Sequence, residues 1–279
     1  MVKLLFFAYF ENMLDTIVEN LRIEVAGEGD IVLVFAHGFG GRKEDWDRYV
    51  AYFKTKATVV SFDHLGSIQV DIPEEFIDLR FSDSNFHTEL LISIIKKYCT
   101  GKKVCLVAHS YSGLLGVNAC LKEPGLIDEL VLIGSSPRYI NDRDYFGGIG
   151  ADGVDQIFQQ IAENFMEWVG DFKGAMLQDD DQNGNDFTTS ILRMGPKRAL
   201  AIAKAIFLSD YREQLKHLEI PTLVIHSSPD PIVSDEAAQF LCSNIRDVRC
   251  EVIKAGGHFP HLHRYNQVIS LIEDFAIKV

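Results

Sequence analysis

One stretch, Lys103–Lys122, constrains the fold of this chain more than any other. The four apolar residues at 104–107 lead directly into Ala-His-Ser-Tyr-Ser at 108–112, and Gly113 then begins a run whose apolar residues recur at helical spacing. The stretch therefore predicts a buried strand, a tight turn and a helix. Such a turn lifts one hydroxyl, that of Ser110, above the end of a parallel sheet. It also sets the next backbone amide at a helix N-terminus, where developing negative charge is stabilised.

The turn departs from the usual Gly-x-Ser-x-Gly pattern, because Ala108 and Ser112 occupy its outer positions. Both residues are small, as the close approach of the strand and helix backbones requires. The alternative interpretation is an ordinary strand–helix junction in which Ser112 is the helix N-cap. The rest of the chain has to decide between the two.

Composition limits the class of protein. The 279 residues are enough for one large domain, or for a core with one insertion. A formal net charge of -13 disfavours nucleic acid and anionic membranes as partners. The nine histidines are scattered and resemble no set of metal ligands, so we expect no metal and no cofactor.

The cysteines form no C-x-x-C pair; Cys105 lies within an expected apolar strand, and Cys120 lies on the elbow helix. We therefore expect reduced thiols and a cytosolic or nuclear location. The cysteines are Cys99, Cys105, Cys120, Cys242 and Cys250.

The first ten residues, MVKLLFFAYF, resemble the apolar region of a signal peptide. Glu11 follows them without a small-x-small cleavage site, so we expect residues 1–17 to be an N-terminal extension packed on the domain. No stretch approaches the length of a membrane-spanning helix.

Strands and helices alternate along the first half of the chain, which predicts an α/β fold with a mainly parallel sheet and helices on both faces. Residues 21–36 predict a hairpin that feeds a buried strand. The other expected strands are Thr58–Phe62, Val104–Val107, Glu129–Gly134, Thr222–His226 and Glu251–Lys254, and the expected helices of the core are Trp46–Phe53, Asn85–Tyr98, the elbow helix after Gly113, Glu236–Cys242 and Val268–Ile277.

The alternation stops after Gly134, and no strand pattern appears from Pro137 to about Leu215. We expect a helical insertion at 137–215 between a first core segment, 18–136, and a second, 216–279. Its helices are predicted at Val154–Trp168, Phe187–Met194 and Arg198–Phe207. The acidic segment 179–186 predicts a solvated loop, because it lacks the spacing of an EF-hand calcium site.

A nucleophilic Ser110 needs a base and an acid that orients the base, in the order serine, acid, histidine. Asp230 follows the strand Thr222–His226, and His258 follows the strand Glu251–Lys254. The carboxyl ends of parallel strands meet at one edge of a sheet, where ligands bind in open α/β folds. Asp230 and His258 are therefore the predicted partners of Ser110.

Both partners have competitors. Asp235 could be the acid, although it resembles the N-cap of the following helix, and Asp230 could serve only in the turn. His261 and His263 compete with His258, which the preceding Gly-Gly favours. For the oxyanion hole we predict the backbone amides of Tyr111 and Phe39, the latter from the glycine-rich loop after an earlier strand.

Several segments together resemble the plant karrikin and strigolactone receptor family, which is itself similar to a bacterial stress-signalling hydrolase of the type that activates a phosphatase. The resemblance covers about Val18 to the C-terminus, and the Ser-Pro-Arg-Tyr of 136–139 is more discriminating than the triad. The segments are His37–Gly40, His109–Ser112, Ser136–Gly148, Phe207–Arg212 and Gly257–Leu262.

The resemblance implies an α/β-hydrolase core with a V-shaped lid of four helices over a hydrophobic pocket. Ile149 stands where the family has a pocket phenylalanine, Tyr111 replaces a usual valine, and Ala108 replaces a usual glycine. Aromatic residues occupy the other matching pocket positions, namely Phe39, Tyr139, Trp168, Phe172, Phe187 and Phe207.

The resemblance also implies a slow serine hydrolase that serves as a receptor for small butenolides. Its partners would be an F-box protein and a repressor target, recruited by a monomer. Two other hypotheses keep the same residues: a metabolic esterase or carbon–carbon hydrolase, and a binding module in which Ala108 and Tyr111 have disabled the turn.

Overall fold

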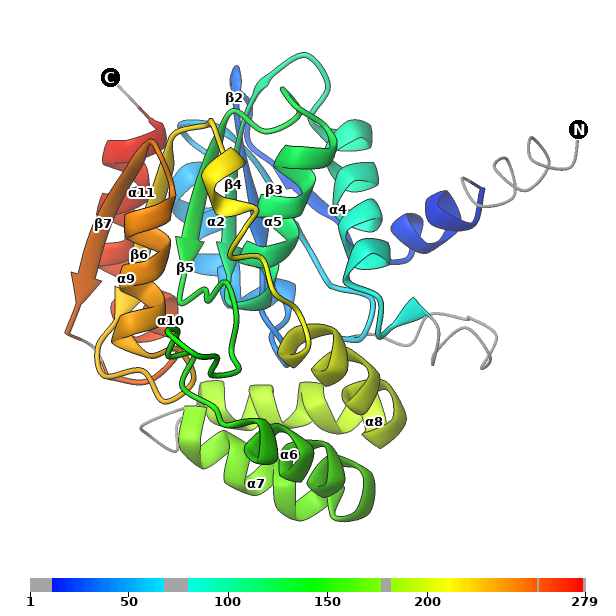
Figure 1. Cartoon of the computed structure of the whole chain (residues 1–279). Coiled ribbons are helices and arrows are strands. Elements are labelled where there is room, and N and C mark those ends of the chain that lie inside the picture. The colour runs from blue at the N-terminus through cyan, green and yellow to red at the C-terminus, as the bar shows by residue number, and fades with distance from the viewer. Residues whose placement is uncertain (1–11, 68–79, 177–181, 255, 278–279) are drawn as a thin grey trace, which may run out of the picture.

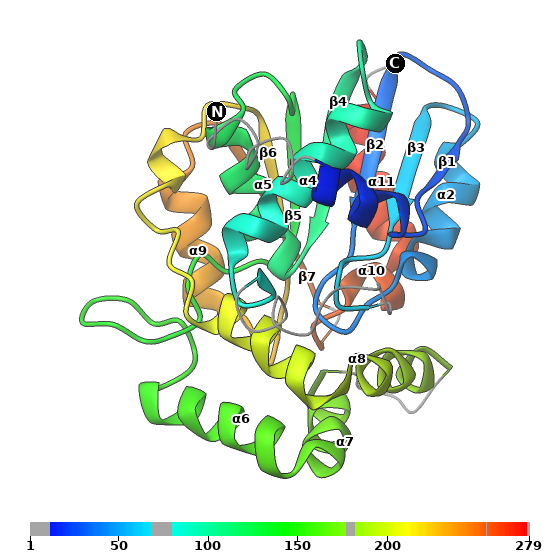
Figure 2. The same cartoon turned by 90° about the vertical axis from the view of Figure 1, so that its right-hand side faces the viewer.

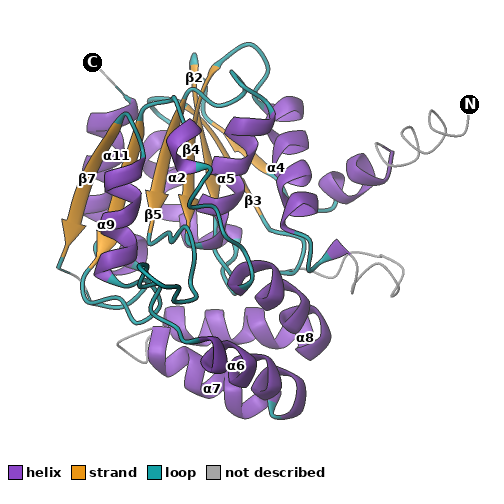
Figure 3. Ribbon diagram, in the orientation of Figure 1, coloured by secondary structure: helices purple, strands orange, loops and turns teal. Residues whose placement is uncertain are grey.

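The computed structural model describes residues 12–67, 80–176, 182–254 and 256–277. It contains a seven-stranded sheet with helices on both faces, which confirms the predicted fold class (Figures 1 and 3). The strand order is β1-β3-β2-β4-β5-β6-β7, and only the pairing of β1 with β3 is antiparallel. The strands are β1 Glu24–Ala26, β2 Ile31–Ala36, β3 Thr58–Phe62, β4 Lys103–His109, β5 Glu129–Ile133, β6 Thr222–Ser227 and β7 Val248–Ile253.

The predicted hairpin of residues 21–36 is wrong. β1 pairs with β3, where Val25 lies opposite Val60, and it does not pair with β2. Both edges of β2 are already occupied, one by β3 and the other by β4. The short strand β1 therefore adds to the outer edge of β3.

Alternate residues of β2 belong to different sides of the core, as the strand periodicity requires. Leu33 and Phe35 pack beneath α2 and α11, whereas Val32 and Val34 pack beneath α4, α5 and α9. Each side of the sheet is thus sealed by its own apolar layer. The bounds of these helices are α2 Asp47–Phe53, α4 Ser84–Tyr98, α5 Tyr111–Lys122, α9 Asp235–Asn244 and α11 Tyr265–Ala276; short helices also occur at η1 Lys43–Trp46, η2 Leu215–His217 and α10 Pro260–His263.

The insertion predicted at 137–215 contains α6 Ala151–Glu163, α7 Phe165–Met176 and α8 Gln182–Phe207. Figure 2 shows these helices beyond the ends of the strands toward which the arrowheads point. The single helix predicted at Val154–Trp168 is wrong, because the helix ends at Glu163 and Trp168 belongs to the next one. α8 is interrupted at Gly195, whose φ of 75° is not helical, so its two parts correspond to the two helices predicted there.

The acidic loop predicted at 179–186 is only partly described. Residues 179–181 lie outside the described residues, and α8 already begins at Gln182, so the remainder is helical and not a loop.

The described part of the N-terminal extension, residues 12–17, belongs to a helix of residues 12–19. Leu14 and Ile17, with Val18 just beyond them, are buried in the core, and Glu19 accepts a hydrogen bond of 3.0 Å from Lys97 of α4. The signal-peptide question concerns residues 1–11, which lie outside the described residues. Within the described part of the chain, no helix has the length and apolar content needed to cross a membrane.

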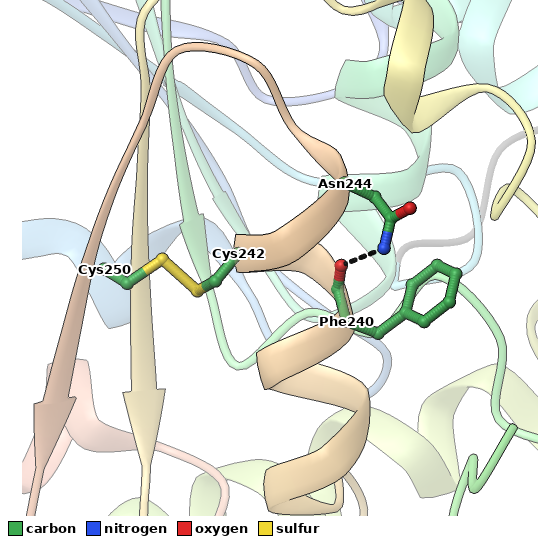
Figure 4. Close-up of a disulfide and its surroundings, with 4 residues drawn as sticks. All are labelled: Phe240, Cys242, Asn244 and Cys250. Atoms are coloured by element: carbon green, nitrogen blue, oxygen red, sulfur yellow. Dashed lines mark hydrogen bonds between the residues drawn. A yellow bond between two sulfur atoms is a disulfide. The ribbon is translucent and has the colours of Figure 1, made fainter.

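The prediction of five reduced cysteines is wrong for two of them. Cys242 of α9 and Cys250 of β7 form a disulfide, with their Cα atoms 6.2 Å apart (Figure 4). Packing of α9 against β7 brings the two residues together, and their separation of eight residues in the sequence gives no C-x-x-C signal. Cys99, Cys105 and Cys120 are free and buried.

Candidate active site

Ser110 lies at the turn between β4 and α5, in the conformation that the sequence pattern predicts. Its φ of 54° and ψ of -119° are rare for a residue with a side chain, because the Cβ atom crowds the backbone there. The close approach of strand and helix is visible at Gly113, where an added Cβ would lie 2.2 Å from the hydroxyl oxygen of Ser135. The alternative with Ser112 as N-cap is wrong, since Tyr111 is already helical and the Ser112 hydroxyl donates to the carbonyl of His37.

Ser110, His258 and Asp230 form a chain of two hydrogen bonds. The Nε2 atom of His258 lies 2.8 Å from the Oγ atom of Ser110, and the Nδ1 atom of His258 lies 2.8 Å from the Oδ2 atom of Asp230. An ionised carboxylate can only accept, so Nδ1–H donates to Asp230 and Nε2 accepts from the Ser110 hydroxyl. The His258 and Asp230 side chains are 1% and 0% exposed, so water is excluded from the pair.

Asp230 is fixed by its own backbone as well as by His258. Its Oδ1 atom accepts hydrogen bonds from the amides of Ile232, at 2.8 Å, and Val233, at 3.1 Å. Three donors therefore hold the carboxylate in one orientation, and the second oxygen is aimed at the imidazole.

The competing residues do not reach Ser110. Asp235 lies 2.7 Å from Nε2 of His226 and is 68% exposed, and the N-cap of α9 is Ser234 rather than Asp235. His261 is buried against Trp46, with ring centroids 4.6 Å apart, and His263 lies on the short helix α10. Geometry therefore favours Asp230 and His258, although their catalytic roles remain a prediction.

A residue that the sequence did not single out holds the histidine in place. His109, directly before Ser110, lies with Nε2 2.9 Å from the carbonyl oxygen of His258, and its ring is buried. Burial lowers the pKa of His109 well below its usual value, so the neutral ring donates this bond. The sequence signals were its position beside the proposed nucleophile and its place in the segment His109–Ser112 of the resemblance.

The loop that carries Phe39 approaches Ser110 closely. A Cβ atom added to Gly38 would lie 2.9 Å from the Cβ of Ser110, so only glycine fits. Among the described residues no hydrogen-bond acceptor is found for the amides of Phe39 and Tyr111, the latter at the N-terminus of α5. Both amides are thus free to donate to a negatively charged oxygen, as the predicted oxyanion hole requires.

Four of the predicted pocket residues form one aromatic cluster. Phe39 lies 5.9 Å from Phe172, which stacks on Trp168 at 4.9 Å and lies 5.8 Å from Phe187 (ring centroids). Phe259, beside His258, also belongs to this cluster, because its ring centroid lies 5.4 Å from that of Phe187. It was not among the predicted pocket residues. The cluster joins the proposed oxyanion loop to helices α7 and α8.

Tyr139, Phe207 and Ile149 occupy a second group. Tyr139 and Phe207 are edge to face at 5.6 Å, and the Ile149 amide donates to the Tyr139 carbonyl at 3.1 Å. The Tyr139 hydroxyl is buried beside Ser110 without a hydrogen bond of normal geometry. Burial raises the pKa of Tyr139, and the neighbouring Ser110 hydroxyl offsets part of the rise. Whether Ile149 contacts a ligand stays a prediction.

The family model described as "Alpha/beta hydrolase family" matches residues 33–271, which include Ser110, Asp230 and His258. The chain belongs to the alpha/beta hydrolase family. A solved hydrolase from Oleispira antarctica has a similar structure, with a TM-score of 0.88 and 26% identity over 95% of this chain and 98% of that one. The similarity extends over nearly the whole of this hydrolase-family chain.

Two plant proteins are similar to this hydrolase over most of its length. The strigolactone esterase D14 of Arabidopsis thaliana is 32% identical over 88% of this chain and 92% of its own. The karrikin insensitive 2 receptor CA of Petunia hybrida is 30% identical over 91% and 94%. The resemblance stated from the sequence motifs is therefore confirmed. A pimeloyl-[acyl-carrier protein] methyl ester esterase of Legionella pneumophila is more distant, at 24% identity over 92% of this chain and 99% of its own.

Proposed function

We propose that this protein is a slow serine hydrolase and a receptor for small butenolides. The observation that carries the proposal is the buried hydrogen-bonded chain from Asp230 through His258 to Ser110, at the turn where a nucleophile is presented in this family. The similarity to a strigolactone esterase and a karrikin receptor supports a lactone or ester as the bound class.

Acylation begins at the Ser110 hydroxyl. The Oγ atom attacks the ester or lactone carbonyl while His258 takes its proton through Nε2, and Asp230 stabilises the resulting imidazolium through Nδ1. The carbonyl oxygen becomes negatively charged and accepts from the amides of Phe39 and Tyr111. Collapse of the intermediate expels the alcohol or enol oxygen, which takes the proton back from His258.

Deacylation repeats these roles with water. His258 removes a proton from water as the water oxygen attacks the Ser110 acyl ester, and it then returns that proton to the Ser110 oxygen. The product is a carboxylic acid, and the enzyme is restored with its original proton positions.

Receptor action would use the helices that cover the site. The aromatic cluster of Phe39, Trp168, Phe172 and Phe187 offers an apolar surface to a ligand between the Ser110 turn and α7 and α8. Closure of these helices over a ligand would create the surface for an F-box protein and a repressor target, with the receptor acting as a monomer. The location proposed from reduced cysteines, cytoplasm and nucleus, loses that argument, because Cys242 and Cys250 form a disulfide.

A metabolic esterase is the second candidate. The similarity to a bacterial methyl ester esterase favours this candidate, because the match covers 99% of that esterase and 92% of this chain. Fast turnover of simple esters without ligand-dependent partner binding would support this candidate over the receptor.

The test is Ser110→Ala with an activated ester and with each stereoisomer of a synthetic strigolactone and a karrikin. We expect the variant to fold normally and to lose about 10³-fold or more in ester hydrolysis, because the nucleophile is gone. Mass spectrometry of the wild type should show an acyl adduct on Ser110, and ligand-induced shifts in melting temperature should persist in the variant. Undiminished hydrolysis by a pure variant would refute the mechanism, and the absence of any butenolide effect on melting would refute the receptor.

A further inference from the structure

A second reactive feature lies away from Ser110, at the disulfide between α9 and β7. Cys250 is exposed and Cys242 is half-buried, and both line one cleft with a volume of about 390 Å³. Figure 4 shows the bond reaching from the helix to the strand, with Phe240 on another side of α9. The cleft gives a small molecule direct access to the sulfur atoms.

The lining of the cleft selects the charge of that molecule. The carboxylate of Asp235 faces it, hydrogen-bonded to His226, and this side chain is 68% exposed. The hydrogen bond from His226 lowers the pKa of Asp235, so this carboxylate is ionised at neutral pH. Arg249 and Glu251 alternate with Cys250 along β7, so their ion pair of 2.9 Å and the pair of Arg249 with Asp274 of α11 lie on the other face of the strand and leave Asp235 as the charge that faces the cleft. A neutral or cationic molecule is favoured there over an anion.

The two elements joined by the disulfide are those that carry the partners of Ser110. α9 follows the loop of Asp230, and β7 precedes the loop of His258. Backbone bonds join the same two loops: the Gly257 amide donates to the Pro229 carbonyl at 2.9 Å, and the Ser228 amide donates to the Ile253 carbonyl at 3.0 Å. The covalent bond and these two hydrogen bonds thus tie the same pair of elements together.

We propose that the Cys242–Cys250 disulfide is a thiol-exchange site, that its preferred reactants are neutral or cationic small thiols, and that its opening loosens the loops of Asp230 and His258. The incoming thiolate attacks the exposed sulfur of Cys250, which forms a mixed disulfide and releases Cys242 as a thiolate that takes a proton from water. A second thiolate attacks the small-molecule sulfur of the mixed disulfide, which releases the small molecule as its own disulfide and Cys250 as a thiolate that takes a proton from water.

The exchange step is tested with three thiols of different charge: cysteamine, 2-mercaptoethanol and 2-mercaptoethanesulfonate. Opening of the disulfide is followed by alkylation and mass spectrometry, and each rate is divided by the rate of the same thiolate with a small model disulfide. We expect cysteamine to be favoured over the sulfonate by about tenfold at low salt, and less at high salt. Equal normalised rates would overturn the preference, and a protein isolated with both cysteines as free thiols would overturn the site.

Matched variants locate the charge effect. Asp235→Asn removes the carboxylate that faces the cleft, so the preference for cysteamine should shrink severalfold. Glu251→Gln removes a carboxylate from the other face of β7, so its effect should be smaller. Glu236→Gln removes an exposed carboxylate from the same turn of α9 that does not line the cleft, and it should leave the preference unchanged. An equal effect at all three positions would indicate the overall charge of the protein and not this cleft.

The loosening step is tested by amide hydrogen exchange, which does not depend on catalysis. Peptides that contain Ser228 and Gly257 should exchange severalfold faster in the reduced protein and in the Cys242→Ser, Cys250→Ser double variant, whereas peptides from β4 should not change. Unchanged exchange in both samples would overturn the coupling. Reduction should also cause a reversible fall in ester hydrolysis, a consequence that rests on the proposed function. If the wild-type protein has no hydrolase activity, the proposed function is refuted, whereas the hydrogen-exchange results still test the coupling.

Discussion

The backbone amide of His258 donates a hydrogen bond of 3.3 Å to the carbonyl of Met176, the last residue of α7. A helix of the insertion therefore contacts the proposed general base directly, through main-chain atoms. Because Nε2 of the same residue contacts Ser110, a displacement of α7 changes the position of the imidazole. This bond offers a physical route by which a ligand held under α7 and α8 alters catalysis.

Gly174 permits a test of this route. An added Cβ there would meet no atom within 4 Å, so Gly174→Ala should be accommodated and should keep wild-type activity. Gly174→Pro should distort the last turn of α7, because proline removes a helical hydrogen bond and clashes with the preceding turn. We expect the proline variant to lose about tenfold in kcat on an activated ester. Its far-ultraviolet circular dichroism spectrum should differ little from that of the wild type, because the core stays folded. Equal kcat values for the two variants would show that α7 does not position His258.

His258 and His261 form a second matched pair. His258→Ala should reduce ester hydrolysis about as much as loss of the nucleophile, because no other imidazole in the described structure is hydrogen-bonded to the Ser110 hydroxyl. His261→Ala should lower the melting temperature, since its ring stacks on Trp46 in the core, but the folded fraction should keep most of its activity. The measurement is kcat per folded molecule, with the folded fraction of each variant taken from its thermal unfolding curve. Similar losses per folded molecule would make the assignment wrong.

Ile149 tests the resemblance where the chain departs from it. Ile149→Phe should change the ranking of butenolide ligands severalfold, because one changed apolar wall discriminates by about 1–3 kcal/mol. Hydrolysis of a small acetate ester should not change, since that reaction needs only the triad and the oxyanion amides. Titration of both proteins with a ligand panel decides the matter, and superimposable affinities would remove Ile149 from the pocket while leaving the triad untouched.

Buried histidines make stability depend on pH. Burial lowers the pKa of His87 to about 4, below the usual value of 6.5 that applies after unfolding. Between these values the unfolded state binds a proton that the folded state does not, so stability is lost as the pH falls from about 6.5 to 4, by about 3 kcal/mol for this residue. Urea unfolding at pH 7, 5.5 and 4.5 measures this loss of unfolding free energy. In His87→Gln the unfolding free energy should fall less steeply as the pH is lowered.

The exposed His217 supplies the control for this prediction. His217 is exposed in the folded protein, so His217→Gln removes a histidine without removing a buried ring, and the loss of stability at low pH should persist in this variant. A wild-type unfolding free energy that stays constant over this pH range would contradict the prediction.

The features that sequence predicted well depend on local pattern or on sheet geometry. The turn at Ser110 follows from an apolar strand, small residues and a helical repeat in consecutive positions. Asp230 and His258 were found because both follow strands that end at the same edge of a parallel sheet. The aromatic pocket residues could be predicted only from the family resemblance, since an aromatic residue at helical spacing does not by itself distinguish a pocket from a core.

The errors concern relationships that only packing determines. Three residues of β1 carry no information about which strand they join, and the occupied edges of β2 decide it. The apolar repeat continues through Asn164, so periodicity alone could not show that the chain turns there. Cys242 and Cys250 pair because α9 lies on β7, and the tether from His109 to His258 exists only once two distant loops meet.

The positive φ of Ser110 has a consequence for selection. A residue with a side chain is strained in that conformation by roughly 1–3 kcal/mol, whereas glycine adopts it freely. Replacement of Ser110 by glycine would therefore relax the backbone and remove the hydroxyl in the same step, while alanine would remove the hydroxyl and keep the strain. Any library of this protein that is sorted for heat resistance alone will drift toward glycine at position 110, and the most durable molecules in it will be the ones that can no longer form an acyl intermediate.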